Sequence, residues 1–233
     1  AIGGIDEAST QKAIEFYKHF VIGTLHPTNA KTAEMVKLVE NASRDNQIAF
    51  ANELSIICDK AGINVWEMIA LANKHPRVNI LNPGTGVGGH CIAVDPWFIV
   101  SEFPEESPLI KKSRETNTYK TEWVIEKIKN KSLAFKIENK RDPIIACMGL
   151  AFKPDIDDLR ESPALLVTKR LISNDFEILA VEPNIKEHTE FDIFTANDAI
   201  KKADIIVFLV KHNEFINIDI KDKIILDFVN SLD

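Results

Sequence analysis

The chain has 233 residues, 45% of them hydrophobic and 27% charged, a composition typical of a globular protein that can bury a core. Its formal net charge of −7 argues against a general nucleic-acid binder, although a local basic pocket for a diphosphate is compatible with that balance. We recognise neither a signal peptide nor an apolar run long enough to span a bilayer, so we expect no membrane partner.

The three cysteines lie far apart, and Cys58 and Cys147 fall in patterns typical of a core helix and a core strand. No disulfide framework is indicated, so we expect a reducing, cytoplasmic location. The histidines and cysteines do not recur at the spacing of zinc ligands, and we therefore expect no structural metal.

The first quarter of the chain is predicted to be mainly helical. A helix is expected over residues 7–21, where apolar side chains recur at three- and four-residue steps at Ala13, Ile14, Tyr17 and Phe20. A longer helix is expected over residues 29–61, with Thr28 or Asn29 as its N-cap and Gly62 at its end. At about thirty residues it exceeds the usual length of a globular helix, so we expect it to connect two domains.

Further helices are predicted over residues 64–73, which Pro76 prevents from continuing, and over residues 108–130. A short helix or turn is expected to begin at residues 97–100. Residues 129–141 are rich in lysine and lack strong apolar periodicity, so we place a domain boundary there.

From Asp142 onward, strands and helices are predicted to alternate. Strands are expected over residues 144–150, 177–181, 205–210 and 224–228, with helices over residues 163–173 and 195–203. The uninterrupted apolar run at 205–210 is typical of a parallel strand that is buried on both faces. The sequence therefore predicts an α/β protein in which an all-helical domain is followed by a Rossmann-like parallel-sheet domain.

A glycine-rich loop at residues 82–98 is the strongest chemical signal. Four of the nine glycines lie within six positions, just before Cys91: Gly84, Gly86, Gly88 and Gly89. Dense glycine permits positive φ and lets backbone N–H groups approach a ligand, so the loop can present Cys91 at a site. On these residues alone, an ordinary surface loop with Cys91 as a small core side chain stays open.

Three segments resemble parts of one known family. Residues 84–98 read Gly-x-Gly-Val-Gly-Gly-His-Cys-Ile-x-Val-Asp-Pro-Trp-Phe and resemble the catalytic-cysteine segment of the UDP-glucose/GDP-mannose dehydrogenase family. Residues 34–41, Glu-Met-x-Lys-Leu-x-x-Asn, resemble its active-site helix, although spacing alone favours a solvated face with charge pairs. Residues 152–163, Phe-Lys-Pro-x-x-Asp-Asp-x-Arg-x-Ser-Pro, resemble a loop of its UDP-sugar-binding domain, where a charged surface loop is the alternative.

The resemblance covers nearly the whole chain and implies three parts. Residues 1–25 would be the remnant of an N-terminal NAD-binding domain that is otherwise absent, with Gly3 and Gly4 following its last strand. Residues 26–135 would form a central helical domain for dimerisation and catalysis. Residues 136–233 would form the UDP-sugar-binding domain.

The resemblance implies catalytic roles for four residues. Cys91 would trap an aldehyde as a thiohemiacetal and then carry a thioester. Lys37 would stabilise the oxyanion or take up the alcohol proton, and Asn41 would orient it or hold a water. Asp95 would activate the hydrolytic water. His90 is adjacent to Cys91 in sequence, and such side chains usually diverge, so we expect no Cys-His dyad.

The resemblance also implies a set of substrate-binding residues: Arg77, Asn82, Gly84, Gly86, Gly88, Gly89, His90, Phe152, Lys153 and Arg160. Arg77 would reach the substrate of a partner subunit across a dimer interface. The cations Lys153 and Arg160, with the helix N-terminus near Pro163, also suit an anion on physical grounds.

Three shorter motifs also match the family. Arg114-x-x-Asn117 resembles a motif that closes its helical domain. Glu182-Pro183 and His212-x-x-Phe215 resemble motifs that we interpret as structural or close to the substrate.

The implied reaction is the oxidation of a UDP-sugar primary alcohol to a carboxylate, with two hydride transfers to two NAD+. The variant at residues 90–95 resembles members that act on UDP-N-acetyl-D-mannosamine, while UDP-glucose and UDP-N-acetylglucosamine stay open. A second interpretation is a dimerising UDP-sugar-binding module without redox activity. Both interpretations imply a homodimer or a higher homo-oligomer formed through the helical domain.

Overall fold

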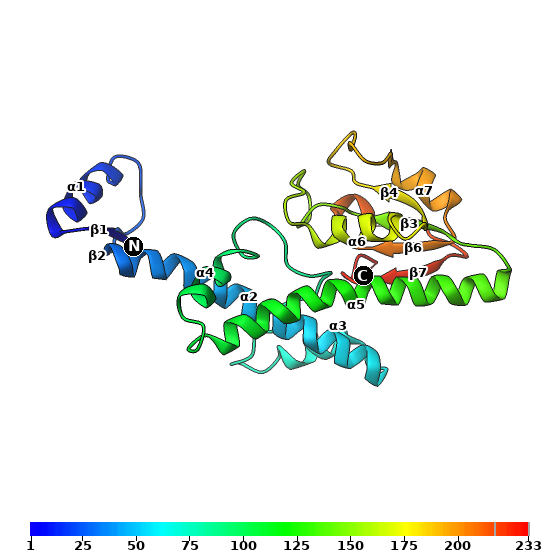
Figure 1. The fold of residues 1–233 in the computed structure, drawn as a ribbon, viewed down its shortest axis with the longest axis horizontal. Helices are drawn as coiled ribbons and strands as arrows, with labels where there is room; N and C mark the ends of the chain where they lie inside the picture. Colours follow the sequence, from blue (N-terminus) through cyan, green and yellow to red (C-terminus); the bar gives the residue numbers. More distant parts are fainter. Residues whose placement is uncertain (217, 233) are drawn as a thin grey trace.

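The computed structural model describes residues 1–216 and 218–232. At the N-terminus, β1 (Ile2–Gly4) pairs in parallel with β2 (Pro27–Asn29), and α1 (Glu7–Tyr17) lies between them in sequence. Figure 1 shows this small unit apart from the rest of the chain, to which α2 joins it. Gly3 and Gly4 lie within β1 and do not follow a strand, which corrects our expectation. A Cβ on Gly3 would lie 2.2 Å from the Asn29 carbonyl oxygen, so glycine permits this close pairing.

The long predicted helix is α2 (Ala30–Ala61), and both of its predicted ends are confirmed. The Asn29 side chain accepts a hydrogen bond from the Thr32 N–H at 2.9 Å, which caps the first turn. Gly62 ends the helix in the left-handed region with φ 69°. The N-terminal end of α2 contacts β1 and β2, so the helix does connect two parts of the molecule.

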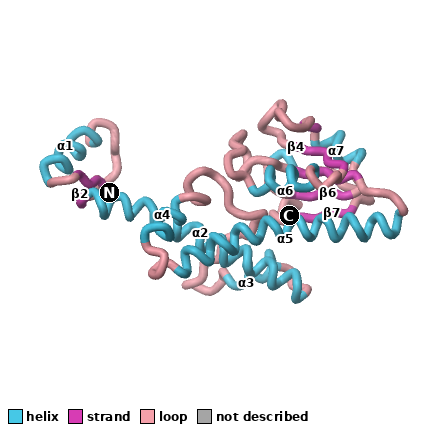
Figure 2. The backbone as a smooth tube through the Cα atoms, viewed as in Figure 1, coloured by secondary structure: helices cyan, strands magenta, loops and turns pink. Residues whose placement is uncertain are grey.

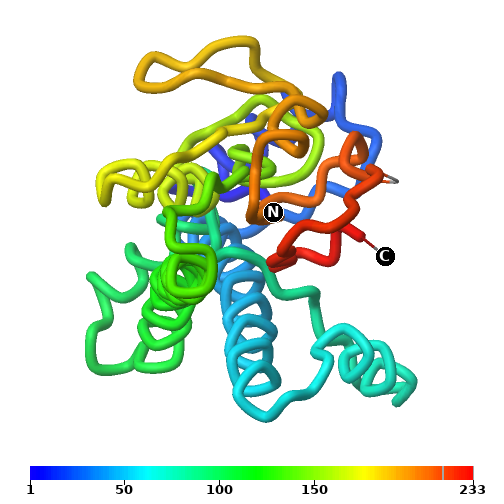
Figure 3. The backbone as a smooth tube through the Cα atoms, turned by 90° about the vertical axis from the view of Figure 1, so that its right-hand side faces the viewer, coloured from blue at the N-terminus to red at the C-terminus, as the bar shows by residue number. Residues whose placement is uncertain are grey.

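The helical part also contains α3 (Val65–Ala72), α4 (Asp95–Glu102) and α5 (Pro108–Asn139). Figure 3 shows α2 and α5 side by side. Figure 2 shows that the chain between α3 and α4 is a long loop. In the residues that the structure describes, no helix is both long and apolar enough to cross a membrane.

A buried polar network joins α2 to α5. The Arg114 guanidinium donates to the Asp45 carboxylate at 2.5 Å, and the Asn117 amide donates to the same oxygen at 2.8 Å. The Asn52 amide donates to the Asn117 side-chain oxygen at 2.9 Å. Burial raises the pKa of Asp45, although Arg114 and Asn117 oppose that rise. Because each buried group needs its partner, this network fixes the relative register of the two helices.

α5 is longer than predicted and continues from residue 130 to Asn139. Its last turns bury Ser132 and Phe135, and Phe135 packs against the core of the sheet. This packing stabilises a segment whose own apolar pattern is weak. The helix ends at Lys140 with φ 57°, so no glycine marks its end in the sequence. The boundary that we placed at residue 135 therefore falls inside α5.

The sheet has five parallel strands in the order β5-β4-β3-β6-β7. Their bounds are β3 (Ile144–Met148), β4 (Glu177–Val181), β5 (Ile193–Phe194), β6 (Ile205–Phe208) and β7 (Ile224–Asp227). The predicted strands are confirmed, with slightly different ends. β5 has only two residues, too few for a pattern to predict it.

Helices cover both faces of this sheet, which confirms the predicted α/β class. On one face α5 and α6 (Pro163–Ile172) bury Ile128 and Val167 against Cys147 and Val207. On the other face α7 (Ala196–Lys202) and the 3₁₀-helix η1 (Asn213–Phe215) pack on Met148 and Phe208. The strands are therefore apolar on both sides, as expected for a doubly wound sheet.

Candidate active site

A cavity lies where the strand order of the sheet reverses. From the central strand β3 the chain proceeds through β4 and β5 on one side, then returns to β6 and β7 on the other. Loops that leave the carboxyl ends of β3 and β6 diverge at such a point and leave a crevice that binds ligands in many α/β proteins. Here the crevice is a cavity of about 460 Å³, lined by residues 44, 48, 81–86, 151–154, 163, 209–211 and 229.

The glycine-rich loop enters this cavity and is anchored to three separate elements. The Gly84 N–H donates to the Asn52 side-chain oxygen on α2 at 2.9 Å. The Thr85 hydroxyl donates to the Leu209 carbonyl after β6 at 3.3 Å, and the Thr121 hydroxyl of α5 donates to the Thr85 carbonyl at 2.9 Å. These bonds hold the loop between the helical part and the sheet.

The end of the glycine loop packs directly on residues 152–162. The Gly89 N–H donates to the Arg160 carbonyl at 3.1 Å. A Cβ on Gly88 would lie 2.5 Å from the Glu161 carbonyl oxygen and 2.7 Å from the Phe152 Cβ. Only glycine permits this approach, so two of the three segments that resemble the family, residues 84–98 and 152–163, form one contact surface.

Five of the predicted substrate-binding residues line the cavity: Asn82, Gly84, Gly86, Phe152 and Lys153. The structure therefore brings together two segments that lie about seventy residues apart in the sequence. Lys153 supplies one of the cations that line the cavity.

Two further cations line the cavity and were not selected from the sequence. Arg44 lies on α2 three residues after Asn41, and Lys211 lies just beyond the carboxyl end of β6. The signal for Arg44 was its position on the same helix face as Asn41. The signal for Lys211 was its place at the edge of a parallel sheet where ligands bind.

Three of the four predicted catalytic residues form a hydrogen-bonded chain. The Lys37 ammonium donates to the Asn41 side-chain oxygen at 3.4 Å, and the Asn41 amide donates to the Asp95 carboxylate. Asn41 is buried, whereas Lys37 is exposed. Cys91 lies one turn before Asp95, whose N–H donates to the Cys91 carbonyl at 2.8 Å. The Cys91 thiol is free and partly exposed.

This arrangement joins an amine, an amide and a carboxylate, and a free thiol lies on the residue one turn before the carboxylate. The Asn41 amide uses its nitrogen for Asp95 and its oxygen for Lys37, so both flanking groups hold its orientation. A carboxylate can accept a proton from water, an amine can stabilise a developing oxyanion, and a thiolate can attack a carbonyl carbon. The cluster can therefore support acyl or aldehyde chemistry at sulfur.

Arg160 does not line the cavity in this structure. Its guanidinium forms two contacts with the Asp158 carboxylate, from Nε at 3.0 Å and from Nη2 at 2.6 Å. These bonds raise the pKa of Arg160 and lower that of Asp158 to about 2.

His90 and Arg77 also lie outside the cavity lining. His90 is exposed on the loop beside Cys91. Arg77 is exposed in the turn after α3, and its N–H donates to the His75 ring at 3.3 Å.

The glycine-rich loop does not have the geometry of a dinucleotide-binding loop. Gly84, Gly86 and Gly89 match the letters Gly-x-Gly-x-x-Gly, but their segment follows no strand and opens no helix. A dinucleotide loop needs both, because the helix N-terminus binds the pyrophosphate. In the part of the chain that the structure describes, no three His, Cys, Asp or Glu side chains are placed to hold a metal ion.

Comparison with known proteins identifies two domains of one family. Residues 31–119 match the central domain of the UDP-glucose/GDP-mannose dehydrogenase family, and residues 146–233 match its UDP-binding domain.

Individual relatives agree with this match. The chain is 54% identical to the UDP-N-acetyl-D-mannosamine dehydrogenase of Campylobacter jejuni, over 96% of this chain and 56% of that protein. It is 48% identical to the NDP-N-acetyl-D-galactosaminuronic acid dehydrogenase of Ralstonia solanacearum, over 97% of this chain and 54% of that protein. Its structure resembles that of the UDP-N-acetyl-mannosamine dehydrogenase of Staphylococcus aureus, with a TM-score of 0.82 and 38% identity.

That structural match covers 99% of this chain and 54% of the Staphylococcus aureus chain. The chain therefore spans just over half the length of the relatives that it matches. Both of its larger parts, the helical part and the sheet, correspond to named domains of one family. The chain belongs to the UDP-glucose/GDP-mannose dehydrogenase family.

Proposed function

We propose that this chain is the substrate-binding and catalytic portion of an NAD-dependent UDP-sugar 6-dehydrogenase that converts UDP-N-acetyl-D-mannosamine to UDP-N-acetyl-D-mannosaminuronate. The observation that carries the proposal is the cavity at the sheet switch point, where the glycine loop meets residues 151–154. The same loop continues into Cys91 and the Lys37–Asn41–Asp95 chain. Nucleotide binding and thiol chemistry therefore share one segment.

The cavity suits the diphosphate of a UDP-sugar. Lys153, Arg44 and Lys211 provide three cations from three different elements, which can face the negative charges of a diphosphate. The Arg160 guanidinium is a fourth cation nearby, which must leave Asp158 before it can bind a phosphate. In this proposal the sugar extends from the cavity toward Cys91.

The chemistry assigned to this chain is addition to sulfur and hydrolysis. The Cys91 thiolate adds to the aldehyde carbon, a C–S bond forms, and the carbonyl oxygen becomes the alkoxide of a thiohemiacetal. Lys37 stabilises that oxyanion, with Asn41 holding the ammonium in place. At the thioester, Asp95 accepts a proton from water as the water attacks, and Cys91 leaves as the thiolate.

The two oxidations require NAD+, whose pyrophosphate the glycine-rich loop does not fit. We propose that a separate NAD-binding domain supplies it in the complete enzyme. The 233-residue chain alone is therefore expected to produce no NADH from NAD+ and UDP-N-acetyl-D-mannosamine. NADH formation by the purified chain, followed at 340 nm, would contradict this expectation.

Two alternatives concern the substrate and the activity. The names of two similar relatives differ in their sugar, so the sugar of this chain's substrate stays open. A substrate screen should therefore also include UDP-glucose and UDP-N-acetylglucosamine. The alternative for the activity is that the chain is a UDP-sugar-binding module without redox chemistry. The free, partly exposed thiol of Cys91, one turn before the Asp95 end of the polar chain, favours the catalytic interpretation. That thiol needs a reducing compartment, so we propose the cytoplasm.

The direct test is calorimetric binding of UDP-N-acetyl-D-mannosamine to wild type, Lys153→Ala and Arg160→Ala. We expect wild type to bind, and Lys153→Ala to bind about tenfold more weakly because a charge-assisted contact is lost. Weaker binding by Arg160→Ala would support its release from Asp158. UDP alone is the control for the sugar. A folded wild type that binds neither compound would overturn the proposal.

A further inference from the structure

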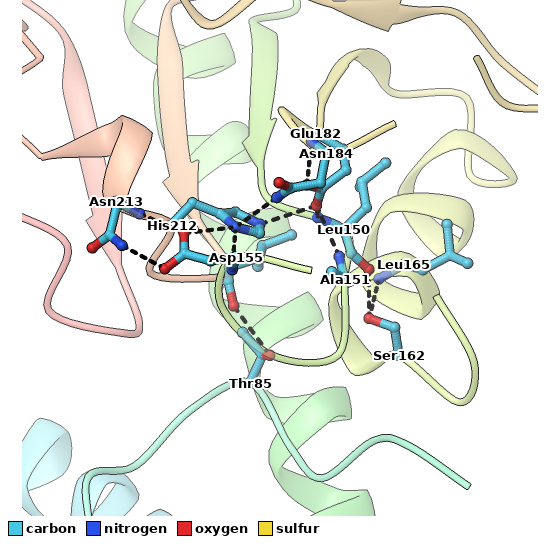
Figure 4. Close-up of polar contacts among 11 residues, drawn as sticks. Thr85, Leu150, Ala151, Asp155, Ser162, Leu165, Glu182, Asn184, His212 and Asn213 are labelled. Atoms are coloured by element: carbon cyan, nitrogen blue, oxygen red, sulfur yellow. Dashed lines mark hydrogen bonds and ion pairs between the residues drawn. The ribbon is translucent and has the colours of Figure 1, made fainter. Parts of the chain in front are cut away.

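Glu182 and His212 form a buried pair behind the cavity. Glu182 follows β4 and His212 follows β6, and both side chains are almost completely buried. The His212 Nε2 lies 3.0 Å from the Glu182 carboxylate, as Figure 4 shows. Neither residue lines the cavity.

Both members of the pair bind the backbone of the loop that follows β3. One Glu182 oxygen accepts hydrogen bonds from the Leu150 N–H at 2.8 Å and the Ala151 N–H at 2.9 Å. The His212 Nδ1 accepts a hydrogen bond from the Asp155 N–H at 2.9 Å (Figure 4). Because Nδ1 accepts, the ring carries its proton on Nε2 and donates it to Glu182.

The surrounding hydrogen bonds keep Glu182 ionised. Burial by itself would raise the pKa of Glu182, but hydrogen bonds from His212, Leu150 and Asn184 outweigh it and lower the pKa to about 2. Glu182 is therefore a carboxylate at neutral pH and accepts from every donor around it. The second anchor is reinforced outside the core, where the Asn213 N–H donates to the Asp155 carboxylate at 2.9 Å.

The two anchors enclose a short span of chain. Residues 150–151 are held at one end and Asp155 at the other, and the three residues between them include Phe152 and Lys153, which line the cavity. Asp155 has φ 59°, a left-handed conformation that non-glycine residues rarely adopt without support. The His212 contact supplies that support.

We propose that Glu182 and His212 are positioning residues that hold the 152–154 span so that Lys153 faces the bound nucleotide. This inference rests on the proposed function of the cavity. A buried carboxylate is costly to desolvate, and an apolar pair could fill the same volume without that cost. What the polar pair adds is a defined backbone conformation on either side of Lys153.

The first experiment compares His212→Gln with His212→Asn by amide hydrogen exchange on the 233-residue chain. Glutamine can reach Glu182 but leaves the Asp155 N–H without its acceptor, whereas asparagine can replace Nδ1 as that acceptor. We expect the amides of Phe152, Lys153 and Asp155 to exchange about tenfold faster in His212→Gln than in His212→Asn, with β3 unchanged. Equal exchange rates in wild type and His212→Gln would overturn the inference. This measurement needs no nucleotide.

The second experiment measures UDP binding in two backgrounds. With Lys153 present, we expect His212→Gln to weaken UDP binding about fivefold, which is the effect of one lost hydrogen bond. In a Lys153→Ala background the same change should have no further effect, because His212 acts through Lys153. An equal loss in both backgrounds would indicate general structural damage and overturn the inference.

The controls separate folding and function from positioning. Should His212→Gln not fold, Asn213→Ala removes the Asn213 side-chain amide, which donates to the Asp155 carboxylate at 2.6 Å. Exchange at the Phe152, Lys153 and Asp155 amides is then measured in that variant with the same two outcomes. A wild type that fails to bind UDP would overturn the proposed function, whereas the exchange result would still decide the role of His212.

Discussion

Cys91 differs from the other two cysteines in how its thiol meets solvent. Cys58 and Cys147 are buried in the helical part and the sheet, whereas Cys91 is partly exposed. Burial raises the pKa of Cys147 to about 12, although a hydrogen bond with Thr168 opposes the rise. Since the thiolate is the reactive form, these environments separate one accessible thiol from two protected ones.

We therefore predict that one thiol per folded chain reacts rapidly with a small disulfide reagent. Cys91→Ser should remove the fast phase, and Cys58→Ser should leave it intact. Denaturant should expose the remaining thiols of each variant. The prediction fails if two thiols of the native wild type react at the same rate.

Lys120 is a buried amine outside the cavity. Its ammonium nitrogen donates to the Ser55 hydroxyl at 2.7 Å and lies 3.9 Å from the centre of the Trp123 ring. Burial lowers the pKa of Lys120 to about 7, which Asp59 partly opposes. In the unfolded chain this pKa returns to about 10.4. Between these values unfolding takes up a proton, so stability rises with pH in that window.

We predict that Lys120→Met flattens this pH dependence. The wild type should gain at most about 1.4 kcal/mol of unfolding free energy per pH unit from Lys120 between pH 7 and 10, and the variant should lose that gain. Urea unfolding at pH 7, 8.5 and 10 measures it, with Lys131→Met, an exposed lysine on the same helix, as control. Parallel stability curves for wild type and Lys120→Met would contradict the assignment.

At the scale of elements, the glycine loop is held by close packing at some positions and is free at others. A Cβ on Gly88 would meet the Glu161 backbone and Phe152, whereas a Cβ on Gly84 would have only one atom as near as 4.0 Å. The loop therefore offers a tight position and an open one four residues apart.

We predict that Gly88→Ala destabilises the chain by about 1–3 kcal/mol, the usual cost of overpacking, while Gly84→Ala is close to neutral. Gly88→Ala should also weaken UDP binding, because residues 152–154 must shift. Urea unfolding and calorimetry provide the two measurements. Equal stability of the two variants would show that the loop does not pack on Phe152 as described.

Local signals account for much of the fold that could be predicted. Asn29 and Gly62 marked both ends of α2, because a cap and a left-handed residue have specific side-chain requirements. The end of α5 could not be predicted, since Lys140 carries no such requirement and Phe135 is stabilised by the distant sheet.

In the candidate site, too, some residues could be predicted from local sequence signals and others could not. Lys37, Asn41 and Asp95 were selected from two resembling segments, and the structure joins them in one chain of contacts. Arg44 and Lys211 were not selected, because they meet only where two elements distant in sequence converge on a cavity. Local patterns do not record that convergence.

At the scale of the whole molecule, the helical part exposes apolar side chains that suggest an interface. Phe50 is 54% exposed and Ile57 52% exposed, and they lie seven residues apart on one face of α2. Leu109 at the start of α5 is 69% exposed and lines a small groove together with Phe50. Exposed apolar patches of this kind mark contact surfaces between chains.

We predict that the chain dimerises through this face. Phe50→Glu combined with Ile57→Glu should raise the dimer dissociation constant about tenfold or more, because buried charges at an interface core are costly. Analytical ultracentrifugation measures it. Leu133→Glu with Ile137→Glu, at exposed positions near the far end of α5, is the matched control. Dissociation by the control pair alone would place the interface elsewhere.

α5 runs beside α2 and then along the sheet as one continuous helix, with neither glycine nor proline after Pro108. Sharp bends in helices need such residues or an interrupted hydrogen-bond ladder. The helical part and the sheet, which form the two walls of the cavity, are therefore joined by one continuous helix. We expect no hinge motion that would move these walls apart. A nucleotide that binds there would enter and leave through fluctuations of the glycine loop, on the nanosecond-to-microsecond timescale of loops, without waiting for slower domain rotation.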